Sequence, residues 1–315
     1  MTPHTSMPPA LLLSAGLGTR LRPLTLVRAK PALPVAGVPM VRRIGSWLAA
    51  AGVRDVVLNL HHLPESIAAL VGDGRDLGVH ARYSWEQPQV LGSAGGVRQA
   101  LKIIGAETFL IVNGDTLTDL DLAPLVAAHS SSGALVTMAV TPNTEPQRYS
   151  GLRVADDGSV RGVVPRGSSE PSFHFIGVQV AHASAFAGIP GGAVANSVGD
   201  VYDGIIASQP GAIRVHHCNA RFWDIGTVAD YWHTSRLFDG RPDAVQVSPV
   251  KKGDSSRITD CILWDDVEVG EQAVLDGCIV TDGVRVPDGA AYARSILMRG
   301  PDGRVIAQPF DPEVK

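Results

Sequence analysis

The sequence predicts an α/β fold: a mostly parallel sheet with helices on both faces, followed by a short C-terminal β-helix. Two observations lead to this prediction. Short apolar runs alternate with helical patterns through the first part of the chain, as strands and helices do around a parallel sheet. Beyond residue 260, an apolar pattern repeats every 17 residues, which is typical of a β-helix.

Composition excludes several classes of protein. The 315 residues are 45% hydrophobic, which allows a sizeable core and predicts two domains. Because the chain has 27 basic and 31 acidic residues, it carries no basic surplus, and nucleic acid and anionic membranes are not expected as partners. Three cysteines are too few for a disulfide framework. No apolar run could span a bilayer, and residues 1–9 lack the basic start of a secretory signal. We therefore expect a cytoplasmic location.

Strands and helices are expected to alternate along the α/β part of the chain. Apolar runs predict strands at residues 10–14, 55–60, 81–85, 108–112 and 134–141. Apolar residues at helical spacing predict helices at residues 40–51, 66–71, 95–104 and 122–129. From Gly151 to Val180 the pattern changes to short strands separated by glycine turns, which predicts an antiparallel excursion over one edge of the sheet.

The C-terminal part contains an internal repeat. Residues 261–271 match residues 278–288 at five of eleven positions, and the same apolar pair starts again at Ser295. This predicts a β-helix of about three coils, and a small β-meander with chance similarity is the alternative. Cys261 and Cys278 occupy equivalent positions and are expected in the core. The residues expected to face inward are Val267, Val269, Ile279, Val284 and Val286.

We predict a catalytic domain at residues 1–238, a linker at 239–249 and the repeats at 250–315. The linker prediction rests on a stretch rich in proline, glycine and aspartate. So few coils bury little core alone. We therefore expect the repeats to pack on the catalytic domain or to join subunits in a homo-oligomer.

A glycine-rich loop follows the first strand. Gly16 and Gly18 let backbone N–H groups approach a polyphosphate closely. Arg20 and Arg22 add guanidinium groups that suit phosphate oxygens. The loop is not a dinucleotide fingerprint, because Leu21 stands at the third glycine position, and it is not a Walker A loop.

Lys30 is the only lysine in the first hundred residues, in a chain that otherwise uses arginine. A lysine in this loop therefore points to a phosphate-binding function. The alternative is a solvated surface side chain.

Two aspartates are candidate metal ligands. Asp115 follows the apolar run 110–112 and so emerges at the carboxyl end of a strand, where ligands bind in open α/β sheets. Asp224 could complete a Mg²⁺ site, since Mg²⁺ takes one or two carboxylates plus phosphate oxygens. Alternatively, Asp115 only forms a turn and Asp224 caps the following helix.

The run Gly16-x-Gly-Thr-Arg-Leu-x-Pro-Leu-Thr, followed by Lys30-Pro31 and Pro39-Met40, closely resembles the signature of the nucleoside-diphosphate-sugar pyrophosphorylases, the sugar-1-phosphate nucleotidyltransferases. Residues 85–96 resemble the base-recognition loop of that family and its following helix. Residues 113–115 and 222–227 resemble the segments that carry its two metal-binding aspartates. The resemblance covers roughly residues 10–235. It implies a Rossmann-like sheet and, for the repeats, the truncated left-handed β-helix of some members.

The resemblance implies that a sugar 1-phosphate attacks the α-phosphorus of a nucleoside triphosphate, with Mg²⁺ as cofactor. Because the attacking group is already an anion, no general base is required, and catalysis rests on positioning and charge neutralisation. The implied catalytic residues are Arg20, at the β- and γ-phosphates, and Lys30, at the α-phosphate and the sugar phosphate. The other implied site residues are Ala15, Gly16, Gly18, Thr19, Glu86, Gly92 and Ser93 for the nucleotide, Gly151, Arg166 and Gly177 for the sugar, and Asp115 and Asp224 for the metal.

The sugar side departs from the family pattern. Members often carry a Glu-Lys-Pro element whose lysine holds the sugar phosphate, whereas this chain reads Val-Val-Pro-Arg-Gly at residues 163–167. Arg166 is a candidate substitute. His174 lies in a strand that resembles the lining of the sugar pocket, where it either packs or binds ligand.

Within the family, the Leu-Gly-x-Ala-Gly-Gly loop and the β-helix look most like mannose-1-phosphate guanylyltransferases, which favours GTP and mannose 1-phosphate. The same chemistry with another base and sugar is an alternative. So is a non-catalytic, nucleotide-sugar-binding regulatory homologue, which the missing Glu-Lys-Pro element favours and the intact Arg20, Lys30, Asp115 and Asp224 oppose.

Overall fold

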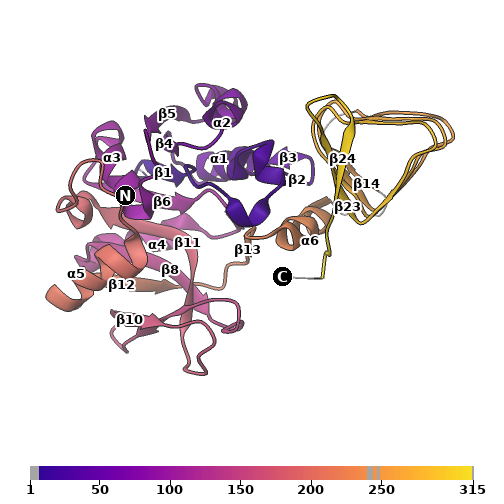
Figure 1. Ribbon diagram of the computed structural model, residues 1–315. Coiled ribbons are helices and arrows are strands. Elements are labelled where there is room, and N and C mark those ends of the chain that lie inside the picture. Colours follow the sequence, from indigo (N-terminus) through magenta and orange to yellow (C-terminus); the bar gives the residue numbers. More distant parts are fainter. Residues whose placement is uncertain (1–6, 240–243, 247–248, 314–315) are drawn as a thin grey trace. The chain divides into compact units, whose positions relative to one another are not determined.

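The computed structural model describes residues 7–239, 244–246 and 249–313 (Figure 1). Packing of the backbone divides the chain into two compact units that do not follow chain order. The first contains residues 1–16 and 44–223, and the second contains residues 17–43 and 224–315. The second unit therefore combines most of the glycine-rich loop with the C-terminal repeats. The sequence-based boundary at residue 238 stays a prediction.

The first unit is built on a nine-stranded sheet. The central strands β5, β4, β1 and β6 run parallel to one another, and β11 runs antiparallel to both β6 and β8. The antiparallel pair β9 and β10 extends one edge, and β12 pairs parallel with β8. The strands are β1 (Ala10–Leu13), β4 (Asp55–Leu60), β5 (His80–Trp85), β6 (Thr108–Asn113), β8 (Val136–Pro142), β9 (Gly151–Val154), β10 (Val160–Val164), β11 (Phe173–His182) and β12 (Ile213–His217).

Helices cover this sheet. Helix α3 (Gly92–Ile104) packs on β1, β4 and β5, and α4 (Leu122–Ser132) packs on β8 and β11. Helix α4 begins where the Asp121 carboxylate accepts a hydrogen bond from the Ala123 amide (3.0 Å). The remaining α-helices among the described residues are α1 (Met40–Ala50), α2 (Pro64–Val71), α5 (Tyr202–Ser208) and α6 (Val228–Asp239).

A hydrophobic core of the first unit lies between the sheet and α3. It joins strand residues such as Leu11, Ile111 and Met138 with Val97 of the helix. The central strands read as nearly continuous apolar runs because both of their faces are buried. All strands and helices predicted between residues 10 and 141 are confirmed, with ends shifted by up to three residues. The predicted antiparallel excursion is confirmed as β9, β10 and β11.

The repeats of the second unit form a β-helix whose triangular outline is visible in Figure 1. Three parallel ladders make its faces, and each strand pairs with the one 17 residues later, as Ile262 does with Ile279. The ladders are β14 (Ala244–Gln246), β17 (Cys261–Leu263), β20 (Ile279–Val280) and β23 (Ser295–Arg299); β15 (Lys251–Lys252), β18 (Glu268–Val269) and β21 (Arg285–Val286); and β16 (Arg257–Thr259), β19 (Val274–Asp276) and β22 (Ala291–Ala293). Strand β24 (Val305–Pro309) runs antiparallel to β23.

The corners of the β-helix explain its 17-residue period. One residue with positive φ stands at each corner, at spacings of six, six and five residues along a coil, so one face is one residue shorter than the others. Glycine relieves the strain of this conformation at some corners, and L-residues accept it at others. The corner residues are Asp260, Asp266, Gln272, Gly277, Gly283, Gly289 and Arg294.

The inner core of the β-helix contains Val267, Val269, Val284 and Val286, as predicted, and both cysteines. The prediction for Ile279 is wrong. This residue is fully buried but lies between Cys278 and Val280, which both point inward, so strand alternation turns it to the outer face.

The predicted linker also needs correction. Its residues 244–246 form β14, which pairs with β17 in the 17-residue register, so the repeats begin before residue 250. Residues 240–243 and 247–248 of the predicted linker lie outside the described part of the chain.

The outer face of the ladder that contains β17 is covered within the second unit. Trp264 is completely buried and packs edge-on against Tyr231 of α6, with ring centroids 6.4 Å apart. Its indole N–H donates to the Tyr231 hydroxyl (2.8 Å), and that hydroxyl donates to the Pro34 carbonyl (2.8 Å). The expectation that so few coils need a packing partner is met by α6 and the segment around Pro34.

Candidate active site

The topology of the central sheet marks a ligand-binding edge. From β1 the chain passes to β4 on one side and later returns to β6 on the other side. In open α/β sheets, ligands bind outside the carboxyl ends of the strands at such a switch point. The glycine-rich loop leaves the sheet here after Leu13, and Asp115 follows β6 at the same edge. The Gly114 amide donates to the Leu13 carbonyl (2.9 Å), so the two segments are in direct contact.

The glycines of the loop differ in their surroundings. Gly16 is exposed, and a Cβ placed on it would meet nothing within 4 Å, which leaves its backbone open to a ligand. Gly18 adopts a φ of 59°, and a Cβ there would lie 2.7 Å from Thr25 Cγ2. The Thr25 hydroxyl donates to the Gly18 carbonyl (2.9 Å). Gly18 is therefore required by the loop itself. Ala15 is buried and Thr19 is exposed.

The two predicted cations both belong to the second unit. Lys30 begins a short 3-10 turn, Lys30–Ala32, and only 9% of the residue is exposed, so it is not a solvated surface lysine. Arg20 is exposed beside Gly226, where a Cβ would lie 3.3 Å from Arg20 Nη1 and 3.4 Å from the Asp230 carboxylate. Gly226 thus leaves room for the guanidinium group next to the turn that follows Asp224.

Asp224 is not the cap of α6. Asp230 Oδ2 accepts hydrogen bonds from the Thr227 amide (2.9 Å) and hydroxyl (2.8 Å), and the Asp230 amide donates back to the Thr227 hydroxyl (3.2 Å). This reciprocal pair satisfies the start of the helix as a capping box does. Capping of α6, the alternative role considered for the Asp224 carboxylate, is therefore performed by Thr227 and Asp230.

A buried network ties the glycine-rich loop to the predicted base-recognition loop. The Ser14 backbone amide donates to Asn59 Oδ1 (2.6 Å), and the side-chain nitrogen Nδ2 of Asn59 donates to Glu86 Oε1 (2.6 Å). Glu86 Oε2 accepts from the Leu91 amide (2.6 Å). Glu86 is 0% exposed, so its carboxylate holds the loop and is not turned to solvent. Asn59 was missed by the sequence analysis, although it is a polar residue within the apolar run that follows Asp55 in β4.

We expect Glu86→Ala to destabilise the fold, because the Leu91 amide and the Asn59 side chain would stay buried without an acceptor, at about 1–3 kcal/mol for each unsatisfied group. Urea unfolding would measure this loss. Glu107→Ala, at an exposed position, is the control and should leave the midpoint unchanged. Equal midpoints for both variants would contradict the network.

The glycines at the start of α3 are explained by close packing. A Cβ on Gly92 would lie 2.6 Å from the Ala195 carbonyl oxygen, and one on Gly96 would lie 2.3 Å from Glu86 Oε1. The first helical amides, from Ala94 and the next residue, both donate to the Ala195 carbonyl (2.9 and 3.1 Å). The Ser93 hydroxyl accepts from the Ser197 amide (2.8 Å). This helix start is therefore held by its own chain, which the sequence pattern did not indicate.

The predicted sugar-side residues lie in different settings. Gly177 has a φ of 81° at a bulge in β11, and a Cβ there would lie 3.1 Å from the side chains of Asn113 and Thr116, which flank Asp115. Gly151 begins β9, and a Cβ on it would clash with Ser172. Arg166 is exposed in a turn.

A cavity of about 460 Å³ in the first unit contains His174. The imidazole stacks on Phe222 (4.8 Å between centroids) and lies 4.1 Å from the ring of Tyr149. Among the described residues, the buried His174 Nδ1 and Asn143 Oδ1 have no hydrogen-bond partner. Buried polar atoms are nearly always satisfied, so this pair indicates a place for a ligand or water. The lining residues are Thr141, Pro142, Asn143, Thr144, Glu145, Tyr149, His174, Cys218, Asn219, Ala220, Arg221, Phe222 and Trp223.

The pKa of His174 is lowered to about 4, mainly because the imidazole is buried; a hydrogen bond with the Ser150 backbone opposes this shift, and the positive charge of Arg148 adds to it. The folded protein keeps this imidazole neutral, whereas the unfolded chain protonates it near pH 6.5. Stability should therefore fall by up to about 3 kcal/mol as the pH drops from 6.5 toward 4. His174→Phe retains a stacked ring and should remove this part of the slope in denaturant unfolding, whereas His80→Gln, at an exposed site, should not. Parallel slopes of the free energy of unfolding against pH for wild type and His174→Phe would contradict this effect of His174.

The donor set at the sheet edge suits a hard cation. Asp115, half-buried at the carboxyl end of β6, offers carboxylate oxygens, which Mg²⁺ prefers. Strand β7 (Thr116–Thr118) begins directly after it and pairs with β13 (Phe222–Asp224). Within the described ranges, no three or more His, Cys, Asp or Glu side chains form a group that could hold a metal ion by themselves. A Mg²⁺ ion here would therefore depend on substrate phosphates for its remaining ligands.

Comparison with known proteins agrees with this geometry. A family model described as nucleotidyl transferase matches residues 9–239, and a GlmU-like, C-terminal hexapeptide model matches residues 243–293. The chain belongs to the nucleotidyl transferase family. Its hexapeptide region has parallel strands, as in a left-handed β-helix.

Two relatives and one solved structure show the range of this family. A mannose-1-phosphate guanylyltransferase from Mycobacterium tuberculosis is 31% identical over 70% of this chain and 62% of its own, so the match spans less than two thirds of that relative. An N-acetylmuramate α-1-phosphate uridylyltransferase from Neisseria meningitidis is 38% identical over 59% of this chain and 80% of its own. HddC from Yersinia pseudotuberculosis, solved with GMP-PN, has a TM-score of 0.64 and 24% identity over 74% of this chain and all of its own, which shows the fold.

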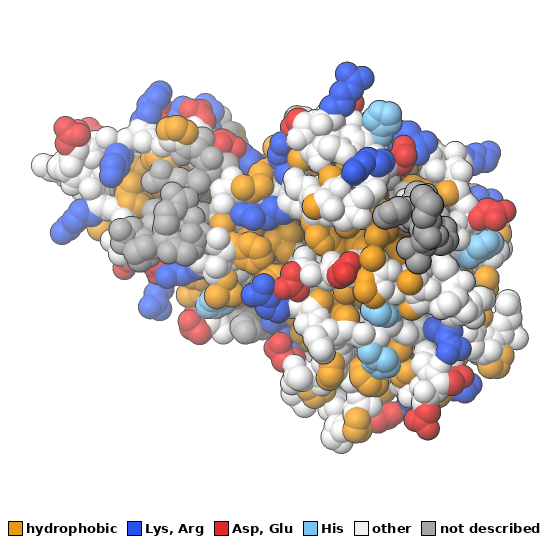
Figure 2. All heavy atoms as spheres, turned by 180° about the vertical axis from the view of Figure 1, so that it is seen from behind, with side chains coloured by type: hydrophobic (Ala, Val, Ile, Leu, Met, Phe, Trp, Pro, Cys, Tyr) orange, Lys and Arg blue, Asp and Glu red, His pale blue; other side chains and the backbone are white. Residues whose placement is uncertain are grey.

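The charged side chains on one face of the molecule are mixed in sign. On the face shown in Figure 2, Lys and Arg side chains are interspersed with Asp and Glu side chains among the coloured residues. None of the described helices is both long and apolar enough to span a membrane.

Proposed function

We propose that the protein transfers a nucleotidyl group from a nucleoside triphosphate to a sugar 1-phosphate and releases pyrophosphate. The observation that carries the proposal is the switch point of the sheet. There the exposed backbone of Gly16 follows β1, and the carboxylate of Asp115 follows the adjacent strand β6. Membership of the nucleotidyl transferase family and the names of its relatives support the same reaction.

In this proposal Asp115 and Asp224 hold one Mg²⁺. When bound, the ion neutralises phosphate charge as the two anionic substrates approach. Both residues offer the hard oxygen ligands that Mg²⁺ prefers, Asp115 directly after β6 and Asp224 as the last residue of β13. Because Thr227 and Asp230 cap the start of α6, the Asp224 carboxylate does not serve as its cap.

The chain's own cations act on the phosphates. Arg20 holds the β- and γ-phosphates through its guanidinium fork, which suits the leaving pyrophosphate. Lys30 offsets the repulsion between the α-phosphate and the incoming sugar phosphate. The backbone of Ala15, Gly16, Gly18 and Thr19 would contact the nucleotide, and Glu86 would act indirectly, by holding the loop that ends at Leu91.

The cavity around His174 provides the sugar side. Aromatic rings and unsatisfied polar atoms together suit a ring that carries hydroxyl groups. Gly151 and Gly177 shape the backbone on this side of the sheet, and the exposed Arg166 is proposed as the substitute for the missing lysine.

As the two substrates we propose GTP and mannose 1-phosphate. The name of the mycobacterial relative supports this choice, and the name of the neisserial uridylyltransferase opposes it. We also propose a cytoplasmic enzyme that works without nucleic acid or membrane, with Mg²⁺ as its metal. A homo-oligomer formed through the C-terminal repeats is compatible with the hexapeptide match.

Pyrophosphate release, measured over a panel of triphosphates and sugar 1-phosphates with Mg²⁺, tests the proposal. We expect one base and one sugar to be preferred by a large factor. Binding of a nucleotide sugar without any turnover in the panel would instead support the regulatory homologue.

A further inference from the structure

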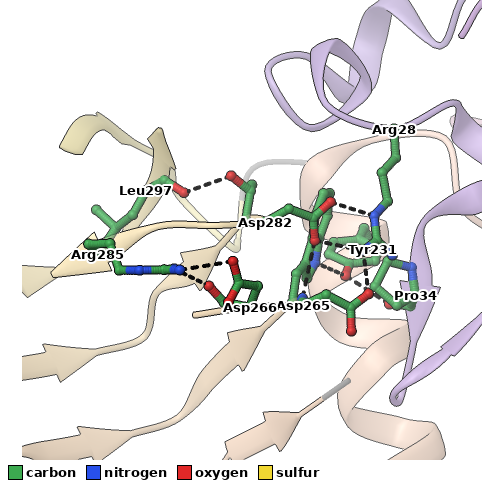
Figure 3. A network of polar contacts seen from close by, with 10 residues as sticks. Arg28, Pro34, Tyr231, Asp265, Asp266, Asp282, Arg285 and Leu297 are labelled. Carbon is green, nitrogen blue, oxygen red and sulfur yellow. Dashed lines mark hydrogen bonds and ion pairs between the residues drawn. The ribbon is translucent and has the colours of Figure 1, made fainter. Parts of the chain in front are cut away.

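Both flanks of the segment that carries Lys30 are held by the β-helix side of the second unit (Figure 3). At one flank, Arg28 Nη2 lies 2.5 Å from Asp265 Oδ2 and 2.6 Å from Asp282 Oδ1, and Arg28 Nε lies 2.7 Å from Asp282 Oδ2. The two aspartates occupy equivalent positions on successive coils, 17 residues apart. One guanidinium group thus pairs with carboxylates on two successive coils of the β-helix.

At the other flank, the Pro34 carbonyl accepts from the Tyr231 hydroxyl, which accepts in turn from the buried Trp264. The ring of Trp264 also lies under the Arg28 guanidinium, 5.2 Å from its centroid. The contacts at residues 28 and 34 are therefore one connected network. Lys30 lies between them, in the short turn Lys30–Ala32.

The chemistry of this network favours fixed geometry more than stability. The Arg28 side chain is only 12% exposed, whereas the Asp265 and Asp282 side chains are 45% and 30% exposed. Such a partly buried ion pair contributes little net stability, because desolvation of the guanidinium group offsets the Coulomb attraction. A guanidinium fork that is paired to two carboxylates, however, fixes direction as well as charge. Because Lys30 is itself almost buried, the direction of its side chain depends on the backbone of this segment.

We propose that Arg28 is a positioning residue through which the β-helix fixes the Lys30 turn. The proposal rests on the function proposed above, in which Lys30 acts between the two substrates. A misplacement of the ammonium group by about 1 Å is enough to reduce the rate by about 100-fold. The β-helix then contributes to catalysis from outside the substrate sites.

A double-mutant cycle tests this relation. We expect Arg28→Ala to lower kcat by about 10- to 100-fold, with little change in triphosphate binding measured without sugar phosphate. In a Lys30→Ala background the same substitution should change kcat by less than about twofold, because the group that it positions is gone. Effects that simply multiply would show an independent structural role and overturn the proposal.

Two further variants separate positioning from folding. Arg285→Ala removes a comparable arginine from an exposed ion pair with Asp266 (2.9 Å) elsewhere in the β-helix and should keep the wild-type kcat. Arg28→Lys keeps the charge, should fold, and should still lose kcat because a lysine cannot make the fork. Wild-type kcat in both Arg28 variants would overturn the proposal.

Hydrogen exchange gives a readout that does not depend on turnover. The Ala32 and Leu33 amides donate to the carbonyls of Ala29 and Lys30 (2.8 and 3.1 Å). In Arg28→Ala these two amides should exchange faster, whereas Arg285→Ala should leave them protected. If the wild type turned over no substrate pair, the proposed function would fail. If exchange at these amides were unchanged in Arg28→Ala, the positioning proposal would fail.

Discussion

Lys30→Ala is expected to depress kcat by about 10²- to 10³-fold, which corresponds to about 3–4 kcal/mol for the loss of one preorganised transition-state cation. Repulsion between the two phosphates peaks as they close, so the ammonium group contributes most at that point. Triphosphate binding in the absence of sugar phosphate should change much less. Lys30 is almost buried, which keeps its charge poorly screened by solvent.

Arg20→Ala is the comparison for this variant. Arg20 is exposed and offers a fork suited to the leaving pyrophosphate. Its loss should therefore weaken triphosphate use and slow the reverse reaction with pyrophosphate. Calorimetric titration and initial-rate assays on both variants separate the two roles. An unchanged kcat in Lys30→Ala would remove the central cation from the proposed mechanism.

Asp115→Asn should lower activity by at least about 100-fold, because the metal supplies several kcal/mol of transition-state stabilisation and the amide is a poorer ligand for Mg²⁺. The substitution is nearly isosteric, so the unfolding midpoint should stay close to wild type. Initial rates measured against Mg²⁺ concentration are the readout. Asp224→Asn should give the same phenotype if both carboxylates serve one ion.

The matched control for the metal site is Asp119→Asn. Asp119 follows β7, close in sequence to Asp115, but forms an exposed ion pair with Arg221 (2.7 Å). Exposed pairs contribute little to stability, so this variant should keep its Mg²⁺ dependence and its rate. Near-wild-type turnover of Asp115→Asn at limiting Mg²⁺ would show that the metal assignment is wrong.

The parts of the fold that follow from local pattern could be predicted. Alternating apolar strands and helices gave the parallel sheet around β1, and the 17-residue repeat gave the inward positions of Val267 and Val284. Ile279 was placed on the wrong face because periodicity shows which residues are buried, but not on which face of the coil they are buried. The strand at residues 244–246 was hidden by a composition that is typical of linkers.

Long-range contacts limited what could be said of the site. The glycines at the start of α3 matched a binding motif, yet Gly92 and Gly96 are required by the Ala195 carbonyl and the Glu86 carboxylate, far away in sequence. Arg28 carries no local signal that distinguishes it from other polar residues, and the position of Asn59 in an apolar run does not indicate its partner. Their roles depend on partners 27 and 254 residues away, which only the folded chain brings together.

Phosphorus-31 NMR of a complete reaction tests the proposed nucleotidyl transfer most directly. With the preferred triphosphate, the matching sugar 1-phosphate and Mg²⁺, we expect the sugar phosphate signal to disappear. A sugar-linked diphosphate and free pyrophosphate should replace it in equal amounts, and Lys30→Ala should form both much more slowly. Orthophosphate in place of pyrophosphate, or a nucleoside monophosphate with the sugar phosphate untouched, would contradict nucleotidyl transfer to a sugar.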